Sequence, residues 1–122
     1  MTPEIEHLQS YLERNIPISM ALGARVLEIG ADTLSVGAPL SANINHKLTV
    51  FGGSLQAIAT LACWSLLHHK LRGETDPGEI VIMNSTIDYT RPVTGDFVAT
   101  AFLPHDKSWK QFKRTFERRG KA

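Results

Sequence analysis

Two adjacent glycines, Gly52 and Gly53, open the longest apolar stretch of the chain. Glycine has no Cβ, so a ligand can approach its backbone closely. The residues behind the glycines predict a helix over 54–72, and a helix N-terminus presents unpaired N–H groups and about half a positive charge. Residues 54–73 contain no Asp or Glu that would neutralise this end. The sequence therefore predicts a site for an anion, or for an oxyanion that forms during a reaction.

Polar side chains flank the two glycines. Asn45 and Thr49 lie in the loop before them, and Ser54 follows Gly53 directly. The Gly52 N–H and the Asn45 amide are the candidate catalytic donors to an oxyanion, with Thr49 and Ser54 as candidates for positioning the reacting group. Each side chain also has a simpler interpretation, because Asn is a common turn residue and both Thr and Ser are common helix N-caps.

Other residues with reactive side chains fit familiar sites poorly. The glycine pair lacks the Lys-Ser/Thr of a P-loop and the spacing of a dinucleotide fingerprint. His68 and His69 would point about 100° apart on a helix, which argues against shared metal ligation, and no metal site is predicted. Cys63 is the single cysteine, and we expect it to be a buried packing residue. Arg91 either binds a phosphate or carboxylate, or anchors its turn.

Composition indicates one ordinary globular domain over residues 1–122. The acidic, polar start predicts no secretory signal. The apolar run is shorter than the roughly 20 residues of a membrane span, and a single cysteine fits a reducing compartment. We therefore expect a cytoplasmic protein without membrane contact.

Charge is distributed unevenly along the chain. The net charge is +1, yet residues 107–122 carry seven Lys/Arg against one Asp/Glu. This basic segment is either a solvated helix face or a contact for an acidic partner. Nucleic acid is not favoured as that partner, because no stacking aromatics interleave with the charges on a strand platform.

Local patterns predict the elements that must position the site. Thr2-Pro3 is a typical helix start, and Pro17 ends that helix. The apolar helix behind the glycines must be buried on most sides. An antiparallel sheet curved around one central helix, an α+β fold, satisfies this requirement. The predicted elements are a helix over residues 3–14, a hairpin over 24–40, a helix over 54–72, strands over 80–89 and 97–103, and a helix over 106–119.

The motifs together resemble a known family. Asn45 stands six residues ahead of Phe51-Gly52-Gly53, a long apolar helix follows, and residues 89–96 read Tyr-x-Arg-Pro-Val-x-Gly-Asp. This pattern resembles the hotdog-fold acyl-thioester enzymes, and in particular a thioesterase domain that some bacteria fuse behind an acetyltransferase module. That family is associated with malonyl-acyl-carrier-protein decarboxylation.

The resemblance implies a homodimer or a higher homo-oligomer with active sites at the interface. It implies a substrate carried on the phosphopantetheine of acyl carrier protein or coenzyme A, with no further cofactor. By the same resemblance, the Gly52 N–H and the loop residue Asn45 correspond to groups at the thioester carbonyl. The residues expected to contact substrate are Phe51, Gly53, Thr60 and Arg91.

Three features depart from the family's pattern. Phe51 stands where a histidine usually precedes the glycines. Thr60 stands where related thioesterases carry an Asp or Glu. Hotdog domains normally add two strands after a segment like 118–121, so we expect this chain to be C-terminally incomplete relative to the family.

The missing helix carboxylate favours one reaction over another. Thioester hydrolysis needs a base or a nucleophile, for which Asp88 is a less favoured candidate. A malonyl thioester that loses carbon dioxide leaves an enolate, whose main need is oxyanion stabilisation. We therefore expect decarboxylation of a malonyl thioester that feeds fatty acid synthesis. Thioester hydrolysis is the alternative, and a non-catalytic acyl-thioester binding module is a third interpretation.

Overall fold

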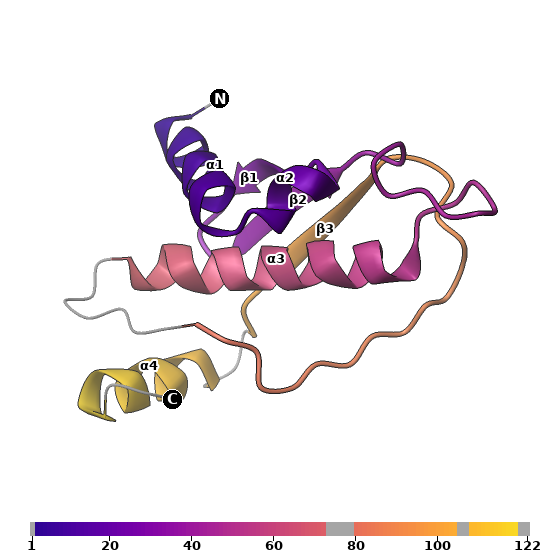
Figure 1. Ribbon diagram of the computed structural model, residues 1–122. Helices are drawn as coiled ribbons and strands as arrows, with labels where there is room; N and C mark the ends of the chain where they lie inside the picture. Colours follow the sequence, from indigo (N-terminus) through magenta and orange to yellow (C-terminus); the bar gives the residue numbers. More distant parts are fainter. Residues whose placement is uncertain (1, 73–79, 105–107, 120–122) are drawn as a thin grey trace.

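A computed structural model describes residues 2–72, 80–104 and 108–119. Three antiparallel strands pack against a long helix, which confirms the expected α+β architecture (Figure 1). The elements are α1 (Pro3–Asn15), α2 (Ile18–Leu22), β1 (Arg25–Ile29), β2 (Thr33–Ala38), α3 (Gly52–Leu71), β3 (Phe97–Phe102) and α4 (Ser108–Arg119). In the part of the chain described, no helix is long and apolar enough to cross a membrane.

The first helix begins as its sequence predicts. The Thr2 hydroxyl accepts a hydrogen bond from the Ile5 N–H at 3.2 Å, and proline occupies the first turn, where its missing N–H costs nothing. Helix α1 ends before Pro17. The short helix α2, which the sequence analysis did not predict, follows and stops at Gly23, whose φ of 68° favours glycine.

The predicted hairpin is present as β1 and β2, and β3 pairs with the other edge of β2. Val36 of β2 lies opposite Val26 on one side and Ala99 on the other. A buried amide satisfies the backbone at the start of β1, since Gln9 donates to the Ala24 carbonyl at 3.0 Å and accepts from the Val26 N–H at 2.8 Å.

The core lies between the sheet and one face of α3. Leu34 and Val36 of β2 and Ile58 of α3 are fully buried there, and each such side chain stabilises the fold by about 1.5–3 kcal/mol. The expectation that α3 is buried on most sides is confirmed, since only Gly53, Gln56 and Cys63 are exposed within it. Gln56 and Cys63 are exposed on the opposite face. Cys63 is therefore not the buried packing residue that we expected.

Residues 80–89 do not form the predicted strand. They run extended along α3 on the side away from α1 (Figure 1). Side chains hold them there: the Trp64 indole N–H donates to the Ile80 carbonyl at 3.0 Å, and the Gln56 amide donates to the Ser85 hydroxyl at 3.3 Å. A strand needs a neighbouring strand edge for its ladder, and among the described residues only α3 lies beside this segment.

The last helix, α4, starts at Ser108, and the first residues of its predicted range lie outside those described. Trp109 attaches it to the rest of the molecule by packing against the core. The Lys70 ammonium lies 5.8 Å from the centre of the Trp109 ring, a distance at which cation–π attraction contributes.

Candidate active site

The N-terminus of α3 is the first part of the candidate site. Phe51 occupies the N-cap position without a capping side chain, and its carbonyl accepts from the N–H groups of Ser54 and Leu55 at 2.9 and 3.2 Å. The N–H groups of Gly52 and Gly53 have no acceptor among the described residues, and the first turn contains no acid. Two backbone donors and the positive end of the helix dipole therefore remain for a ligand.

Both glycines provide space next to an aromatic ring. A Cβ on Gly52 would lie 3.5 Å from the Tyr89 ring, and a Cβ on Gly53 would lie 2.5 Å from the Phe51 ring. The Tyr89 hydroxyl donates to the Gly52 carbonyl at 3.2 Å. Phe51 itself is 58% exposed. Two aromatic rings thus lie beside the glycines.

Asn45 organises its own loop. Its Oδ1 accepts from the N–H groups of Lys47 and Thr49 at 2.9 and 3.1 Å, and its Nδ2 donates to the Thr49 hydroxyl at 2.9 Å. Through these bonds, Asn45 and Thr49 stabilise the turn. The sequence had left a turn role open as the simpler interpretation of Asn45. Leu48, with φ of 63°, closes the turn in the left-handed region, which is uncommon for a residue other than glycine.

Ser54 lies on the wrong face of α3 for the role predicted from sequence. Residues advance by about 100° along a helix, so Ser54 points away from the face that carries Gly52. It is only 8% exposed, among the core residues. Neither Ser54 nor Thr49 is the N-cap, since that position belongs to Phe51.

A groove lies beside α3, where its lining starts at Gln56, one turn after Gly52. It has a volume of about 250 Å³ and lies between α3 and the segment 80–89. Its α3 wall consists of Gln56, Thr60 and Cys63 with Ala59, and Gly52 precedes Gln56 by one turn on the same face. Thr60 therefore lines this groove, whereas Gly52 and Gly53 do not. Partial burial raises the pKa of the Cys63 thiol.

Among the residues that line this groove, sequence analysis predicted only Thr60 as a site residue, and it missed the contact of Tyr89 with Gly52. The spacing of Gly52, Gln56 and Thr60 by four residues was the available signal for a common face. The position of Tyr89 had no such signal, because it depends on where a distant segment crosses the helix.

Arg91 lies outside this arrangement. It is exposed, and within the described ranges it has no ion pair or side-chain hydrogen bond. Its neighbours are structural: the Val93 carbonyl accepts from the Val50 N–H at 2.9 Å, and the Asp96 carboxylate accepts from the Leu40 N–H at 2.9 Å. The motif that contains Arg91 thus anchors the loop before α3.

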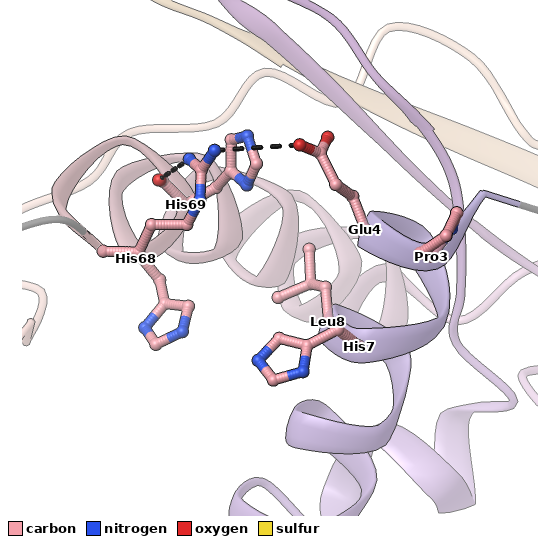
Figure 2. A pocket seen from close by; sticks show the side chains of 7 residues that line it. Pro3, Glu4, His7, Leu8, His68 and His69 are labelled. Atoms are coloured by element: carbon pink, nitrogen blue, oxygen red, sulfur yellow. Dashed lines mark hydrogen bonds and ion pairs between the residues drawn. The ribbon is translucent and has the colours of Figure 1, made fainter.

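A second pocket lies at the opposite end of α3 (Figure 2). It has a volume of about 260 Å³ and lies between the start of α1, with Glu4 and His7, and the end of α3, with His68, His69 and Arg72. Burial, followed by the charges of the neighbouring histidines His69 and His7, lowers the pKa of His68. In the part of the chain that the structure describes, no three His, Cys, Asp or Glu side chains are grouped to hold a metal ion.

Aromatic packing and one ion pair involve residues that line this pocket. The His68 ring lies 4.4 Å from that of Tyr11 and 4.9 Å from that of Trp64, measured between centres. The Arg72 guanidinium lies 3.7 Å from the Glu4 carboxylate. Since a carboxylate already occupies this pocket, it is a poor site for the oxygen of a thioester.

Comparison with solved structures defines the class of the fold. A protein of unknown function from Chlorobaculum tepidum TLS is 34% identical, with a TM-score of 0.86 over 94% of this chain and 71% of that one. A structure from Shewanella oneidensis titled "putative thioesterase" is 28% identical, with a TM-score of 0.77 over 88% and 77% of the two chains. A Pseudomonas aeruginosa protein at 22% identity has a TM-score of 0.76 over 94% and 75%. Together with the sheet and central helix, these likenesses place the chain among the hotdog folds.

A family model described as "Putative thioesterase (yiiD_Cterm)" matches residues 5–122. The chain belongs to this thioesterase family, as its motifs predicted. The family description and the Shewanella title both name a thioesterase. They therefore support hydrolysis, the alternative in the sequence analysis, better than decarboxylation.

Proposed function

We propose that this chain acts on an acyl thioester, with the N–H groups of Gly52 and Gly53 as donors to the thioester oxygen. The observation that carries this proposal is the pair of amides at the start of α3, without an acceptor among the described residues and without an acid in the first turn. Negative charge grows on this oxygen in the transition state. Fixed donors at that position typically contribute about 3–4 kcal/mol each.

Hydrolysis is the reaction that the family description supports. The substrate is a thioester of coenzyme A or of acyl carrier protein, which the phosphopantetheine arm presents to the amides. Water must then be oriented and deprotonated. Gln56 and Thr60 line the groove as polar groups that can orient it, and Asp88, next to Tyr89, is the nearest carboxylate in sequence to the groove segment.

Decarboxylation of a malonyl thioester is the second candidate, and one specific observation favours it. The groove between α3 and residues 80–89 is lined by no Asp or Glu among the described residues, and α3 contains none. A malonyl thioester would lose carbon dioxide, the electron pair would move to the thioester oxygen, and protonation of the enolate carbon would give an acetyl thioester. This sequence needs the oxyanion donors but no base on the helix.

Product analysis distinguishes the candidates. The protein and its Asn45→Ala variant are incubated with malonyl and acyl thioesters of coenzyme A and of acyl carrier protein, and products are identified by mass spectrometry. Hydrolysis gives free thiol, and decarboxylation gives an acetyl thioester with carbon dioxide. Saturable binding without either product would support the non-catalytic binding module. Absence of both binding and turnover with every thioester would contradict the proposal.

An acidic carrier protein is the presenting partner that the charge of α4 favours. Lys110, Arg114 and Arg118 are spaced by four residues and are exposed, so they form one basic stripe. Reversal of Lys110, Lys113 and Arg114 to Glu is expected to lower kcat/KM for a carrier-protein thioester about tenfold, because electrostatic steering governs association. The matching coenzyme A thioester serves as the control. Equal losses on both substrates would contradict this choice of partner.

We further propose that the chain forms a homodimer or a higher homo-oligomer. Apolar side chains are exposed around the start of α3, with Leu48 at 71% and Phe51 at 58%. Exposed apolar groups next to a site are typical of interfaces. Sedimentation at several protein concentrations tests this proposal, and a monomer at every concentration would contradict it.

A further inference from the structure

We propose that Asn43 is a positioning residue, which fixes the direction of the free amides at the start of α3. The inference rests on the proposed acyl-thioester function and adds a residue that acts on the reaction through Phe51. It comes from the hydrogen bonds of Asn43, which connect the end of α2 and the residue after β2 to the N-cap of α3.

The backbone carbonyl of Asn43 binds the residue that precedes the free amides. It accepts from the Phe51 N–H at 2.7 Å. The Phe51 carbonyl in turn accepts from the N–H groups of Ser54 and Leu55. Because a trans peptide group is planar, the Phe51 carbonyl and the Gly52 N–H point in opposite directions. The bonds that fix Phe51 therefore also fix the direction of the Gly52 donor.

The side chain of Asn43 is itself fixed by two hydrogen bonds. Its Nδ2 donates to the Leu22 carbonyl at the end of α2 at 2.9 Å, and to the Pro39 carbonyl, one residue after β2, at 2.8 Å. The Asn43 N–H donates to the Leu40 carbonyl at 2.9 Å. Asn43 is only 4% exposed, and a hydrogen bond in the protein interior is electrostatically stronger than one in water. Asn43 thus connects α2 and the sheet to the start of α3.

These contacts require the side chain of asparagine. Two carbonyl oxygens need two donors from one short side chain, and the Asn amide supplies both. An ionised aspartate has the same shape but no donor, and a serine has only one. The Asn43 Oδ1 has no donor among the described residues, so the side chain is fixed through its Nδ2 alone. The number of donors at this position is therefore the quantity to vary.

Loss of these donors should change kcat more than KM. A misdirected amide weakens its bond to the thioester oxygen most in the transition state, where the negative charge on that oxygen is largest. Asn43→Ala should therefore lower kcat about tenfold or more and change KM less than about twofold. Asn43→Ser, which keeps one donor, should lie between this variant and the wild type. The substrates are acetyl-, octanoyl- and malonyl-coenzyme A.

Gln9→Ala is the matched control for a merely structural role. Gln9 is also a buried amide bound to the backbone, and its partners Ala24 and Val26 lie at the start of β1. Gln9→Ala should lower the melting temperature and leave kcat unchanged. The carbonyl stretch of a bound, isotope-labelled thioester should return toward its frequency in water in Asn43→Ala but not in Gln9→Ala. Equal kcat values and equal carbonyl frequencies in the two variants would overturn the inference.

Hydrogen exchange of wild-type protein tests the bond from Phe51 to Asn43 without any substitution. Phe51 is 58% exposed, yet its N–H is bound, whereas those of Gly52 and Gly53 have no acceptor among the described residues. After correction for the intrinsic rate of each residue, exchange followed by NMR should be about tenfold or more slower at Phe51 than at the glycines. Equal protection of the three amides would overturn the inference, even if Asn43→Ala fails to fold.

The outcomes separate this inference from the proposed function. Absence of both binding and turnover with every thioester would contradict the acyl-thioester function, and the inference with it. Turnover by the wild type, with no difference in kcat between Asn43→Ala and Gln9→Ala, would overturn the role of Asn43 and leave the function intact.

Discussion

The two ends of α3 differ in whether charged or capping side chains complement the helix dipole. At the C-terminal end, His68, His69 and Lys70 occupy the last turn, where basic side chains complement the negative end of the helix dipole. At the N-terminal end there is no acidic residue and no capping side chain, and two amides have no acceptor in the described residues. The comparison indicates that one end serves stability, while the other is left open for a ligand.

Contacts at the C-terminal end support this distinction. The Lys70 ammonium pairs with the Asp32 carboxylate at 2.8 Å and also donates to the Ala31 carbonyl. The Arg72 guanidinium pairs with Glu4 and donates to the His69 carbonyl. These bonds fasten α3 to the β1–β2 turn and to α1. Comparable fastening at Gly52 is limited to its carbonyl, which accepts from Tyr89.

The largest expected effect comes from removal of one free amide. Gly52 is the first residue of α3, a position that favours proline because the missing N–H has no helical partner. Phe51, with φ of −60° and ψ of 133°, already has the extended conformation that proline requires of the preceding residue. Gly52→Pro should therefore fold and should lower kcat roughly 100- to 1,000-fold, the usual effect of losing an oxyanion donor.

Gly52→Ala is the matched control for this prediction. It keeps the N–H and adds a Cβ at ordinary contact distance, 3.5 Å from the Tyr89 ring. Steady-state kinetics and a thermal melt of both variants are the measurements. Equal activity of the proline and alanine variants, with both proteins folded, would remove Gly52 from the oxyanion site.

A smaller effect is expected when an acidic residue is placed in the first turn of α3, as in an ordinary helix. Gly53 is exposed, and an Asp at this position can accept from the free amides. Gly53→Asp should lower kcat/KM about tenfold, although the Phe51 ring must move aside for the new Cβ, which would otherwise lie 2.5 Å from it. Gly53→Asn, which lacks the charge, is the control. An increase in activity with Asp would contradict the assignment of the amides to a developing negative charge.

Acidic pH is expected to lower the stability of the fold through the two histidines at the C-terminal end of α3. Burial is the main cause that lowers the pKa of His68, and the charges of His69 and His7 lower it further. Burial is also the main cause that lowers the pKa of His69. Arg72 and Lys70 lower that pKa further, whereas the Glu4 carboxylate acts in the opposite direction. Folded protein therefore binds protons less readily than unfolded protein, and stability falls as the pH drops below about 6.5, the usual histidine value. Urea midpoints measured across this range test the sign.

A double His68→Gln, His69→Gln variant provides the comparison for the acid effect. It should show a smaller loss of stability between neutral and acidic pH than the wild type. Identical pH dependence of the two proteins would show that the pocket at this end of α3 plays no part in the acid response.

The smallest effect is expected for the ion pair between Arg72 and Glu4. Both side chains are more than half exposed, and exposed pairs contribute about 0–1 kcal/mol. Glu4→Gln should lower the free energy of unfolding by less than about 1 kcal/mol and should not alter kcat. A tenfold loss of kcat/KM, the effect expected for Gly53→Asp, would contradict the separation of the two ends.

How far sequence predicts this molecule depends on how local each feature is. The start of α1 at Thr2 and the hairpin over β1 and β2 follow from neighbouring residues, and both are confirmed. The strand predicted over 80–89 is wrong, because pairing depends on which edge lies beside a segment and not on the segment's own pattern. Helix α2 was missed because five residues give too little periodicity.

The same contrast applies to the candidate site. The free amides of Gly52 and Gly53 were foreseen from two glycines and a helix without acids. Ser54 was placed with them by proximity in sequence, yet one hundred degrees per residue turns it into the core. Cys63 was expected to be buried because α3 is apolar nearly all round, whereas the number of covering strands decides which face is exposed.

The central claim is that the amides at the start of α3 polarise a thioester carbonyl. Infrared difference spectroscopy of a bound acyl thioester with an isotope-labelled carbonyl measures this polarisation directly. The account predicts that the carbonyl stretch shifts to lower frequency on binding to the wild-type protein, and that most of this shift is lost in Gly52→Pro. The same frequency in both proteins, with substrate bound to each, would contradict it.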